Sequence, residues 1–134
     1  MIWLLDTNMC IYLIKARPER VLSRLRALDV AVVAVSSITV AELQYGVAKS
    51  ARPEQNALAL AGFLAPLTVR AFDDAAAATY GTVRANLERV GKPIGSMDML
   101  IAAHALALKS TLVTNNAREF IRVDGLKLEN WANE

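Results

Sequence analysis

The sequence predicts an α/β fold in which helices flank a central parallel β-sheet. Strand-like and helix-like segments alternate along all 134 residues, which is typical of successive βα units and not of a helical bundle. Residues that open, cap or break helices, among them Pro53, Asp73 and Gly91, stand between these segments. The sequence contains no internal repeat, low-complexity tract or linker. A single domain over residues 1–134 is therefore expected.

Short apolar runs mark the predicted strands. The first run stops at Asp6 and is followed by Thr7 and Asn8, a pair that is typical of the start of a helix. The predicted strands are 2–5, 30–35, 68–72 and 111–114, with an edge strand at 126–128.

The spacing of apolar residues and the position of prolines mark the predicted helices. Pro18 separates the first two helices, and a later helix carries Val40, Leu43 and Val47 on one face and ends near Ser50. The other predicted helices are 8–16, 19–28, 53–64, 74–90 and 97–109, with a short helical turn that contains residues 119–120.

Composition excludes several classes of protein. Hydrophobic residues make up 54% of the chain and charged residues 21%, which excludes a disordered chain. The longest uncharged apolar stretch, 99–108, is interrupted by His104 and is shorter than a membrane span. The N-terminal apolar run lacks a basic segment before it, so we expect no secretory signal and a cytoplasmic protein. The single Cys10 fits a reducing compartment and a place in the core.

Three acidic residues lie where predicted strands meet helices or where helices begin. Asp6 ends the first strand, Glu42 follows the second, and Asp98 opens the helix 97–109. In a parallel sheet these positions share one edge, where ligands bind. Carboxylates that meet there repel one another unless a cation lies between them. Because their oxygens are hard ligands, that cation would be Mg²⁺ or Mn²⁺.

Each of these acids also has a structural explanation. Asp6 would cap the helix that follows it, and Asp98 would be a first-turn acid favoured by the helix dipole. Glu42 stands three residues after Thr39, the spacing of a capping box. The functional interpretation is favoured because all three acids fall on the one edge that the architecture uses for ligands.

Histidine-dependent chemistry is disfavoured. His104 is the only histidine, and it lies six residues beyond Asp98, on another face of the same helix. We therefore expect a hydrogen-bonded helix residue rather than a catalytic one. The sequence also lacks a Walker-type phosphate loop and a GxGxxG motif. Metal-assisted hydrolysis, in which an ion activates water, remains.

Basic residues are concentrated in one part of the chain. Between residues 15 and 26, five residues are basic and only one, Glu19, is acidic. This segment is either a solvated helix face or a flank that contacts phosphates. Together with two residues near the predicted acidic edge, the candidates for contact with a phosphate backbone are Lys15, Arg17, Lys92 and Arg118.

Five motifs follow one another along nearly the whole chain, and together they resemble the PIN-domain ribonucleases, specifically the VapC toxins of toxin–antitoxin pairs. Any one motif would be a weak signal, but five in order at the family's spacing are a strong one. The motifs are Leu4-Leu5-Asp6-Thr7-Asn8, Val40-Ala41-Glu42-Leu43-x-Tyr45-Gly46, Pro93-Ile94-Gly95-Ser96-x-Asp98-x-Leu100-Ile101-Ala102-Ala103-His104-Ala105, Leu112-Val113-Thr114-Asn115-Asn116-x-Arg118-Glu119-Phe120 and Val123-x-Gly125-Leu126-x-Leu128-Glu129-Asn130-Trp131.

The resemblance implies a PIN-like three-layer domain and a Mg²⁺-dependent (or Mn²⁺-dependent) endoribonuclease. It implies that Asp6, Glu42 and Asp98 hold the metal and its water, with Glu42 as a ligand or as a base that orients the water. It also implies a homodimer and inhibition by a cognate VapB antitoxin. The match to the subgroup with Asn-Asn-x-Arg-Glu-Phe suggests a structured RNA as substrate, above all transfer RNA.

The chain departs from the family at the fourth acid. The family often has Thr-x-Asp after the fourth strand, whereas this chain has Asn116 at that position. Either the amide oxygen of Asn116 contributes a weaker ligand or Glu119 takes the role. A structural alternative is that Asn116 caps the short helix and Glu119 closes the cap.

Two other classes of protein are alternatives. A receiver module shares a small parallel sheet with an acidic edge, but it requires paired acids after the first strand, where this chain has only Asp6. A catalytically silent domain that binds its antitoxin is the other alternative. Metal binding separates the silent domain from the enzyme.

Overall fold

A five-stranded parallel sheet forms the centre of the structure, a computed structural model that describes residues 1–132. The strand order within these residues is β3-β2-β1-β4-β5. The middle strand, β1, pairs with both β2 and β4, so the chain changes direction across the sheet between β1 and β4. Their carboxyl ends therefore form the switch point at which α/β sheets bind ligands. The strands are β1 (Trp3–Leu5), β2 (Val33–Ser36), β3 (Thr68–Arg70), β4 (Thr111–Val113) and β5 (Lys127–Glu129).

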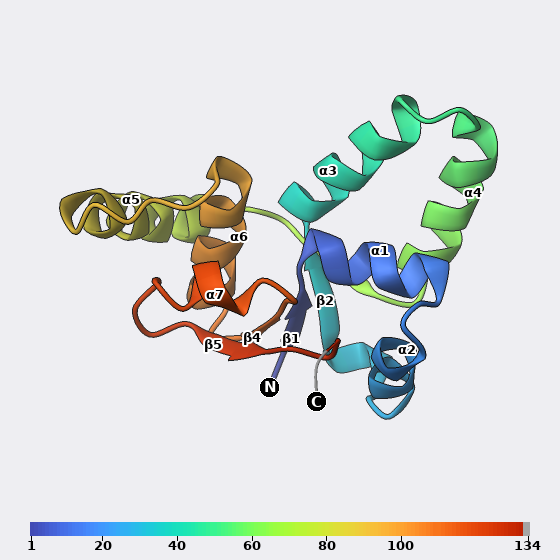
Figure 1. The fold of residues 1–134 in the computed structure, drawn as a ribbon, viewed down its shortest axis with the longest axis horizontal. Coiled ribbons are helices and arrows are strands. Elements are labelled where there is room, and N and C mark those ends of the chain that lie inside the picture. The colour runs from blue at the N-terminus through green and yellow to red at the C-terminus, as the bar shows by residue number, and fades with distance from the viewer. Residues whose placement is uncertain (133–134) are drawn as a thin grey trace.

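Helices cover both faces of the sheet, and Figure 1 shows α5, α6 and α7 on one side and α1 and α2 on the other. The α3 and α4 helices form an arm beyond the carboxyl ends of the strands (Figure 1). The helices are α1 (Thr7–Lys15), α2 (Glu19–Arg26), α3 (Ser37–Ala48), α4 (Pro53–Leu64), α5 (Asp74–Arg89), α6 (Ser96–Ala107) and α7 (Ala117–Phe120).

Two apolar cores result from the alternation of side chains along the strands. Leu4 and Leu112 face the core beneath α5, α6 and α7, whereas Leu5 and Val113 face the core that α1 to α4 cover. Cys10 is fully buried in the second core, as the sequence predicts. The central strands β1, β2 and β4 are buried on both faces, which is typical of parallel sheets, whereas the edge strands β3 and β5 are partly exposed. The predicted three-layer architecture is confirmed.

Most predicted element boundaries agree with the structure to within two residues, but the strand predicted at 30–35 is wrong in its first half. Residues Val30–Val32 form a turn of 3₁₀ helix, and β2 begins at Val33. The side chain of Asp29 accepts a hydrogen bond of 2.9 Å from the Ala31 backbone N–H. This local bond offers the backbone an alternative to the strand ladder, so the apolar run alone misleads.

Three helices that follow strands have a side-chain cap. Two of them begin within two residues of the end of a strand, and the third begins after a short connecting segment. Asp6, Ser36 and Asp73 accept backbone hydrogen bonds at the starts of α1, α3 and α5. These caps satisfy first-turn N–H groups that otherwise lack partners. The caps by Asp6 and Ser36 also fix the turns that place Asp6 and the helix of Glu42. No helix within residues 1–132 is long and apolar enough to cross a membrane.

Candidate active site

Asp6 lies at the switch point, between β1 and α1, and only 4% of its surface is exposed. One carboxylate oxygen, Oδ1, accepts a hydrogen bond of 2.9 Å from the Met9 backbone N–H. The pKa of Asp6 is raised from 3.8 to about 6, mainly by burial and also by the charges of Asp98 and Glu42, while hydrogen bonds from Thr114 and Met9 act to lower it. Asp6 is thus a helix cap, as its structural explanation states, and it is also a buried acid whose charged form is disfavoured.

Asp98 lies in the first turn of α6 and is half-buried. Burial raises the pKa of its carboxyl, and the negative charges of Glu119 and Glu42 raise the pKa further. Since Asp6 also senses the charges of Asp98 and Glu42, four carboxylates share one electrostatic environment. The structure therefore brings together Asp6, Glu42, Asp98 and Glu119 from four separate parts of the chain.

Glu42 is held from the neighbouring helix. Thr7, the first residue of α1, donates a hydrogen bond of 2.6 Å from Oγ1 to Glu42 Oε1. The capping-box alternative for Glu42 is wrong, because Ser36 caps α3 through Ile38 N–H and Thr39 already lies inside the helix. Helix capping therefore does not explain the acid at this position.

Asn116 and Glu119 contact each other at the start of α7. Asn116 Nδ2 donates a hydrogen bond of 2.8 Å to Glu119 Oε2. The Asn116 backbone N–H donates to Thr114 Oγ1 at 2.9 Å, and its side chain makes no capping bond. The capping alternative for this pair is therefore wrong. Glu119 instead directs its charge toward Asp98.

The oxygen atoms of the four acids and Asn116 are of the kind that binds a divalent cation, although the side chains do not converge on one common point. Carboxylate oxygens and an amide are the ligands that Mg²⁺ and Mn²⁺ prefer. Two unfavourable features, the buried charge of Asp6 and the mutual repulsion of the acids, would both be relieved by a cation. Within residues 1–132, no three acid, histidine or cysteine side chains lie as a group that could hold an ion. Each glutamate is instead bound to a neighbour, Glu42 to Thr7 and Glu119 to Asn116.

The predicted RNA-contact residues are all exposed, and they come from two parts of the chain. Lys15, at the end of α1, lines a cavity of about 360 Å³ between α1, α3 and α4 that Thr7 and Glu42 also line. Arg118 is exposed and directly precedes Glu119, while Lys92 is exposed in the loop before α6. Arg17 is also exposed, between α1 and α2.

Part of the basic segment on α2 has a structural role. Arg24 forms an ion pair with Glu129, at the end of β5. Its guanidinium also lies 5.7 Å from the centre of the Trp131 ring. A contact with both an acid and an aromatic face fixes an arginine in place. Arg24 therefore joins α2 to the C-terminal segment.

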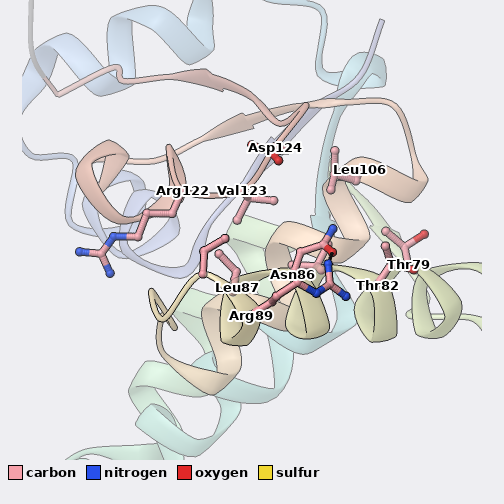
Figure 2. A pocket seen from close by; sticks show the side chains of 11 residues that line it. Thr79, Thr82, Asn86, Leu87, Arg89, Leu106, Arg122, Val123 and Asp124 are labelled. Atoms are coloured by element: carbon pink, nitrogen blue, oxygen red, sulfur yellow. Dashed lines mark hydrogen bonds between the residues drawn. The ribbon is translucent and has the colours of Figure 1, made fainter.

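Another cavity lies on the side of the sheet that carries α5 and α6, and Figure 2 shows its lining. It measures about 370 Å³, and none of the four clustered acids lines it. Arg89 donates a hydrogen bond to Asn86 within this lining. Arg122 points away from Arg89, and it donates to the Pro93 carbonyl at 3.2 Å. Asp6 and Asp98, whose carboxyl pKa values are raised, do not line this cavity, so the chemistry is assigned to the acidic edge and not to this cavity.

Comparison with known proteins agrees with this geometry. Residues 3–126 match the family model of the PIN domain. The chain belongs to the PIN-domain family. It is 47% identical over 132 residues to a Rickettsia felis protein named ribonuclease VapC2, with 98% of each chain covered. It is 44% identical to a Shigella flexneri protein named tRNA(fMet)-specific endonuclease VapC, with 97% of this chain and 98% of that protein covered.

A solved complex shows the same fold. The structure of VapBC2 from Rickettsia felis bound to a DNA fragment from its promoter has a TM-score of 0.92 and 45% identity to this PIN domain, and covers 98% of this chain and 99% of that one. The strand order of the chain, β3-β2-β1-β4-β5, differs from the 2-1-3-4-5 order of receiver modules. The receiver-like alternative is therefore wrong.

Sequence reasoning missed two hydroxyl groups of this PIN domain. Thr7 holds Glu42, and Thr114 hydrogen-bonds both Asp6 and the Asn116 backbone. Both threonines directly adjoin predicted site residues or their strands in the sequence. Hydroxyls next to carboxylates are common, however, and only the pairing of β1 with β4 shows which carboxylate Thr114 meets.

Proposed function

We propose that residues 1–134 form a single PIN domain that hydrolyses RNA phosphodiester bonds with a divalent cation, as the toxin of a toxin–antitoxin pair. The observation that carries the proposal is the convergence of Asp6, Glu42, Asp98 and Glu119 at the switch point, with Asp6 buried. The names and full-length coverage of the VapC relatives support it.

A bound cation would supply a more acidic water and positive charge for the phosphoryl group. Asp6 and Asp98 would hold this cation, which we assign as Mg²⁺ or Mn²⁺ because the donors are hard oxygens. Glu42 binds the cation or orients the attacking water, and Thr7 fixes the direction of its carboxylate through the 2.6 Å hydrogen bond. Glu119 completes the site with its charge, and Asn116 holds Glu119 by a hydrogen bond.

The basic side chains beside the acids hold the RNA backbone. Lys15 and Arg17 lie on the α1 side, and Lys92 and Arg118 lie on the side of α6 and α7. Contacts of this kind position a nucleic acid without reading its sequence. The two sides together place the scissile phosphate over the carboxylates.

Transfer RNA is the proposed substrate, since a relative that matches nearly the whole chain is named for cleavage of initiator tRNA. The test incubates the purified protein with Mg²⁺ and a panel of initiator and elongator tRNAs and maps the ends of the products. Cleavage of the initiator tRNA at one internal site supports the proposal. Cleavage of all tRNAs at the same rate contradicts a preference for the initiator, and no cleavage of any RNA contradicts the activity.

A VapB-type antitoxin is the proposed partner, as in the solved VapBC complex. The cavity between α1, α3 and α4 offers Ile11, Ile14 and Leu60 to an apolar segment, and it opens beside Glu42. An arginine from the antitoxin would fit the carboxylates, because its guanidinium binds a carboxylate through two hydrogen bonds. A complex in which the antitoxin never approaches Asp6 or Asp98 would contradict direct blocking of the site.

We further propose a homodimer that acts in the cytoplasm. The mass in solution, measured by light scattering, tests the dimer. If the measured mass equals that of one protomer at protein concentrations of about 10 μM, the dimer is contradicted. Location is tested by fractionation of cells that express the chain, where recovery of the protein outside the cytoplasmic fraction would contradict the proposal.

A further inference from the structure

His104 forms a buried hydrogen bond between two of the helices that carry the acids. It lies on α6 with 1% of its surface exposed, and its Nδ1 is 2.8 Å from Ser36 Oγ. Ser36 ends β2 and caps α3. The predicted hydrogen-bonded helix residue is thus confirmed, and its partner belongs to the helix of Glu42.

Ser36 Oγ accepts the Ile38 backbone N–H at 3.0 Å, and its hydroxyl donates to His104 Nδ1 in the tautomer that carries the ring proton on Nε2. A neutral imidazole accepts at one nitrogen and donates from the other. The backbone of Ala71 hydrogen-bonds the same ring. The ring therefore has partners in β2, α3 and the segment between β3 and α5.

Burial is the main cause of a lowered pKa at this imidazole and so favours its neutral form. Burial lowers the pKa of His104, Arg70 lowers it further, and Asp73 and the Ala71 backbone oppose them. The Phe72 ring packs edge-on against the imidazole, with ring centres 5.4 Å apart. The Phe72 backbone N–H also donates to Ser37 Oγ at 3.0 Å. Contacts around the histidine thus connect three parts of the chain, which are α6, the start of α3 and the segment between β3 and α5.

The His104–Ser36 hydrogen bond joins the two helices that carry Asp98 and Glu42. Asp98 lies six residues before His104 on α6, and Glu42 lies six residues after Ser36 on α3. At the rise of an α-helix, each acid is about 9 Å from the bond along its own helix. Figure 1 shows the two helices on opposite sides of the carboxyl end of β2. The His104–Ser36 bond therefore joins the helix of Asp98 to the start of the helix of Glu42 at one fixed point.

We propose that His104 is a positioning residue, which sets the separation of Glu42 and Asp98 through its hydrogen bond to Ser36. The inference rests on the proposed function, because the spacing matters for catalysis only if the two acids serve one cation. Neither His104 nor Ser36 touches the reacting atoms in this account. Loss of such a supporting partner lowers metal affinity by about 10–100-fold in metalloproteins.

The test compares His104→Leu, which removes the acceptor and retains an apolar side chain, with His104→Asn, whose Oδ1 can accept at the position of Nδ1. The matched control is Ser110→Ala. Ser110 is also buried, and the change removes its 3.1 Å hydrogen bond to the carbonyl of Ala105, which lies next to His104 in the last turn of α6. This control has a comparable structural defect without a bond to α3.

The first readout measures the spacing without RNA or metal. Spin labels on Ala41→Cys and Met97→Cys, exposed neighbours of the two acids, report the distance between α3 and α6. The native Cys10 is buried and does not react. We expect a broader distance distribution in His104→Leu, the parent distribution in Ser110→Ala, and partial recovery in His104→Asn.

The second readout is Mn²⁺ affinity by calorimetry. We expect about tenfold weaker binding in His104→Leu, no change in Ser110→Ala, and partial recovery in His104→Asn. Ser36→Ala removes the same bond and also the α3 cap at the Ile38 N–H, so it should weaken binding at least as much. Adding His104→Leu to Ser36→Ala should weaken binding little further, since the His104–Ser36 bond is already absent. Folded His104→Leu with the parent distance distribution and parent Mn²⁺ affinity would overturn the proposal.

The two proposals fail in different ways. A parent protein that neither cleaves RNA nor binds Mn²⁺ contradicts the proposed function, whereas the spin-label distances still decide the role of His104. If His104→Leu does not fold, His104→Asn and Ser36→Ala carry the comparison. Parent distances in both of these would overturn the proposal, as the Ser36→Ala variant lacks the hydroxyl.

Discussion

Thr7 Oγ1 and Glu42 Oε1 lie 2.6 Å apart, which is a short hydrogen bond from the first residue of α1 to a carboxylate on α3. A hydroxyl-to-carboxylate bond of this length is charge-assisted. It couples the helix that Asp6 caps to the helix that carries Glu42. The direction of the Glu42 carboxylate is therefore set from the switch point of the sheet.

Thr7→Val tests this coupling. The change keeps the shape of the side chain and removes the donor, so the Glu42 carboxylate loses its fixed direction. We expect a fall in kcat of about tenfold, the low end for a supporting partner of a metal site, and little change in KM. Steady-state cleavage of a tRNA substrate measures both constants. An unchanged kcat would show that Glu42 needs no support from α1.

Glu42→Gln separates catalysis from stability. Since Ser36 and not Glu42 closes the start of α3, the melting temperature should stay close to that of the parent. Cleavage should fall at least about 10²-fold, the low end for a positioned acid–base group. A fully active Glu42→Gln protein would return this residue to a structural role.

Asp6→Asn should stabilise the protein in the absence of a cation. The pKa of Asp6 rises from 3.8 to about 6 on folding, so the folded state holds a proton more tightly than the unfolded state. Stability from this group is full below about pH 4 and is lost as pH rises toward 6. The loss is on the order of 3 kcal/mol, and asparagine avoids it while retaining an oxygen for the Met9 N–H cap.

The stability measurement for this variant is urea unfolding at pH 5 to 8 in EDTA. The parent should weaken from pH 5 to 6 and then level off, and Asp6→Asn should show a smaller slope and a higher midpoint at pH 7. Cleavage by the variant should be lost. A variant less stable than the parent at pH 7, or one that cleaves RNA near the parent rate, would contradict the assignment of Asp6.

Cation affinity should depend on pH through the same carboxyl group. Below pH 6 the Asp6 carboxyl takes up a proton, and a protonated carboxyl is a poor ligand. Calorimetric titration with Mn²⁺ should show affinity that falls up to about tenfold per pH unit below 6 and is nearly constant above 7. Constant affinity from pH 5 to 7 would place the cation away from Asp6.

Glu119→Gln tests the fourth position of the site. Because the capping alternative is excluded by the Asn116 hydrogen bonds, the melting temperature should not change. Loss of the Glu119 charge, which acts on Asp98, should weaken Mn²⁺ binding or reduce its stoichiometry. Unaltered binding and cleavage would remove Glu119 from the site and leave three carboxylates.

The sequence predicts the acidic site because its members occupy positions with a topological meaning. Asp6 ends a strand and Asp98 opens a helix, and a parallel sheet brings such positions to one edge. The limits of α4, residues 53–64, also follow from sequence, since Pro53 fixes the first turn. These features depend on local residues and on the order of elements alone.

Other features depend on contacts that distant parts of the chain make. The Thr7–Glu42 and His104–Ser36 bonds join residues 35 and 68 positions apart, and no local pattern encodes them. The capping box expected at Thr39 and Glu42 fails because Ser36 caps the helix three residues earlier. The strand expected at 30–35 fails because Asp29 stabilises a turn. In both cases a hydrogen bond between a nearby polar side chain and the backbone decides the local structure, and not the pattern of residue types.

The measurement that tests the central claim most directly is single-turnover cleavage of initiator tRNA by the parent and by Asp98→Asn, each with Mg²⁺ and with EDTA. We expect cleavage by the parent in Mg²⁺ only, its loss in EDTA, its return when excess Mn²⁺ is added, and at least about 10²-fold slower cleavage by folded Asp98→Asn in Mg²⁺. Equal cleavage by the two proteins in Mg²⁺, or cleavage by the parent that persists in EDTA, would contradict a carboxylate-held cation as the basis of the activity.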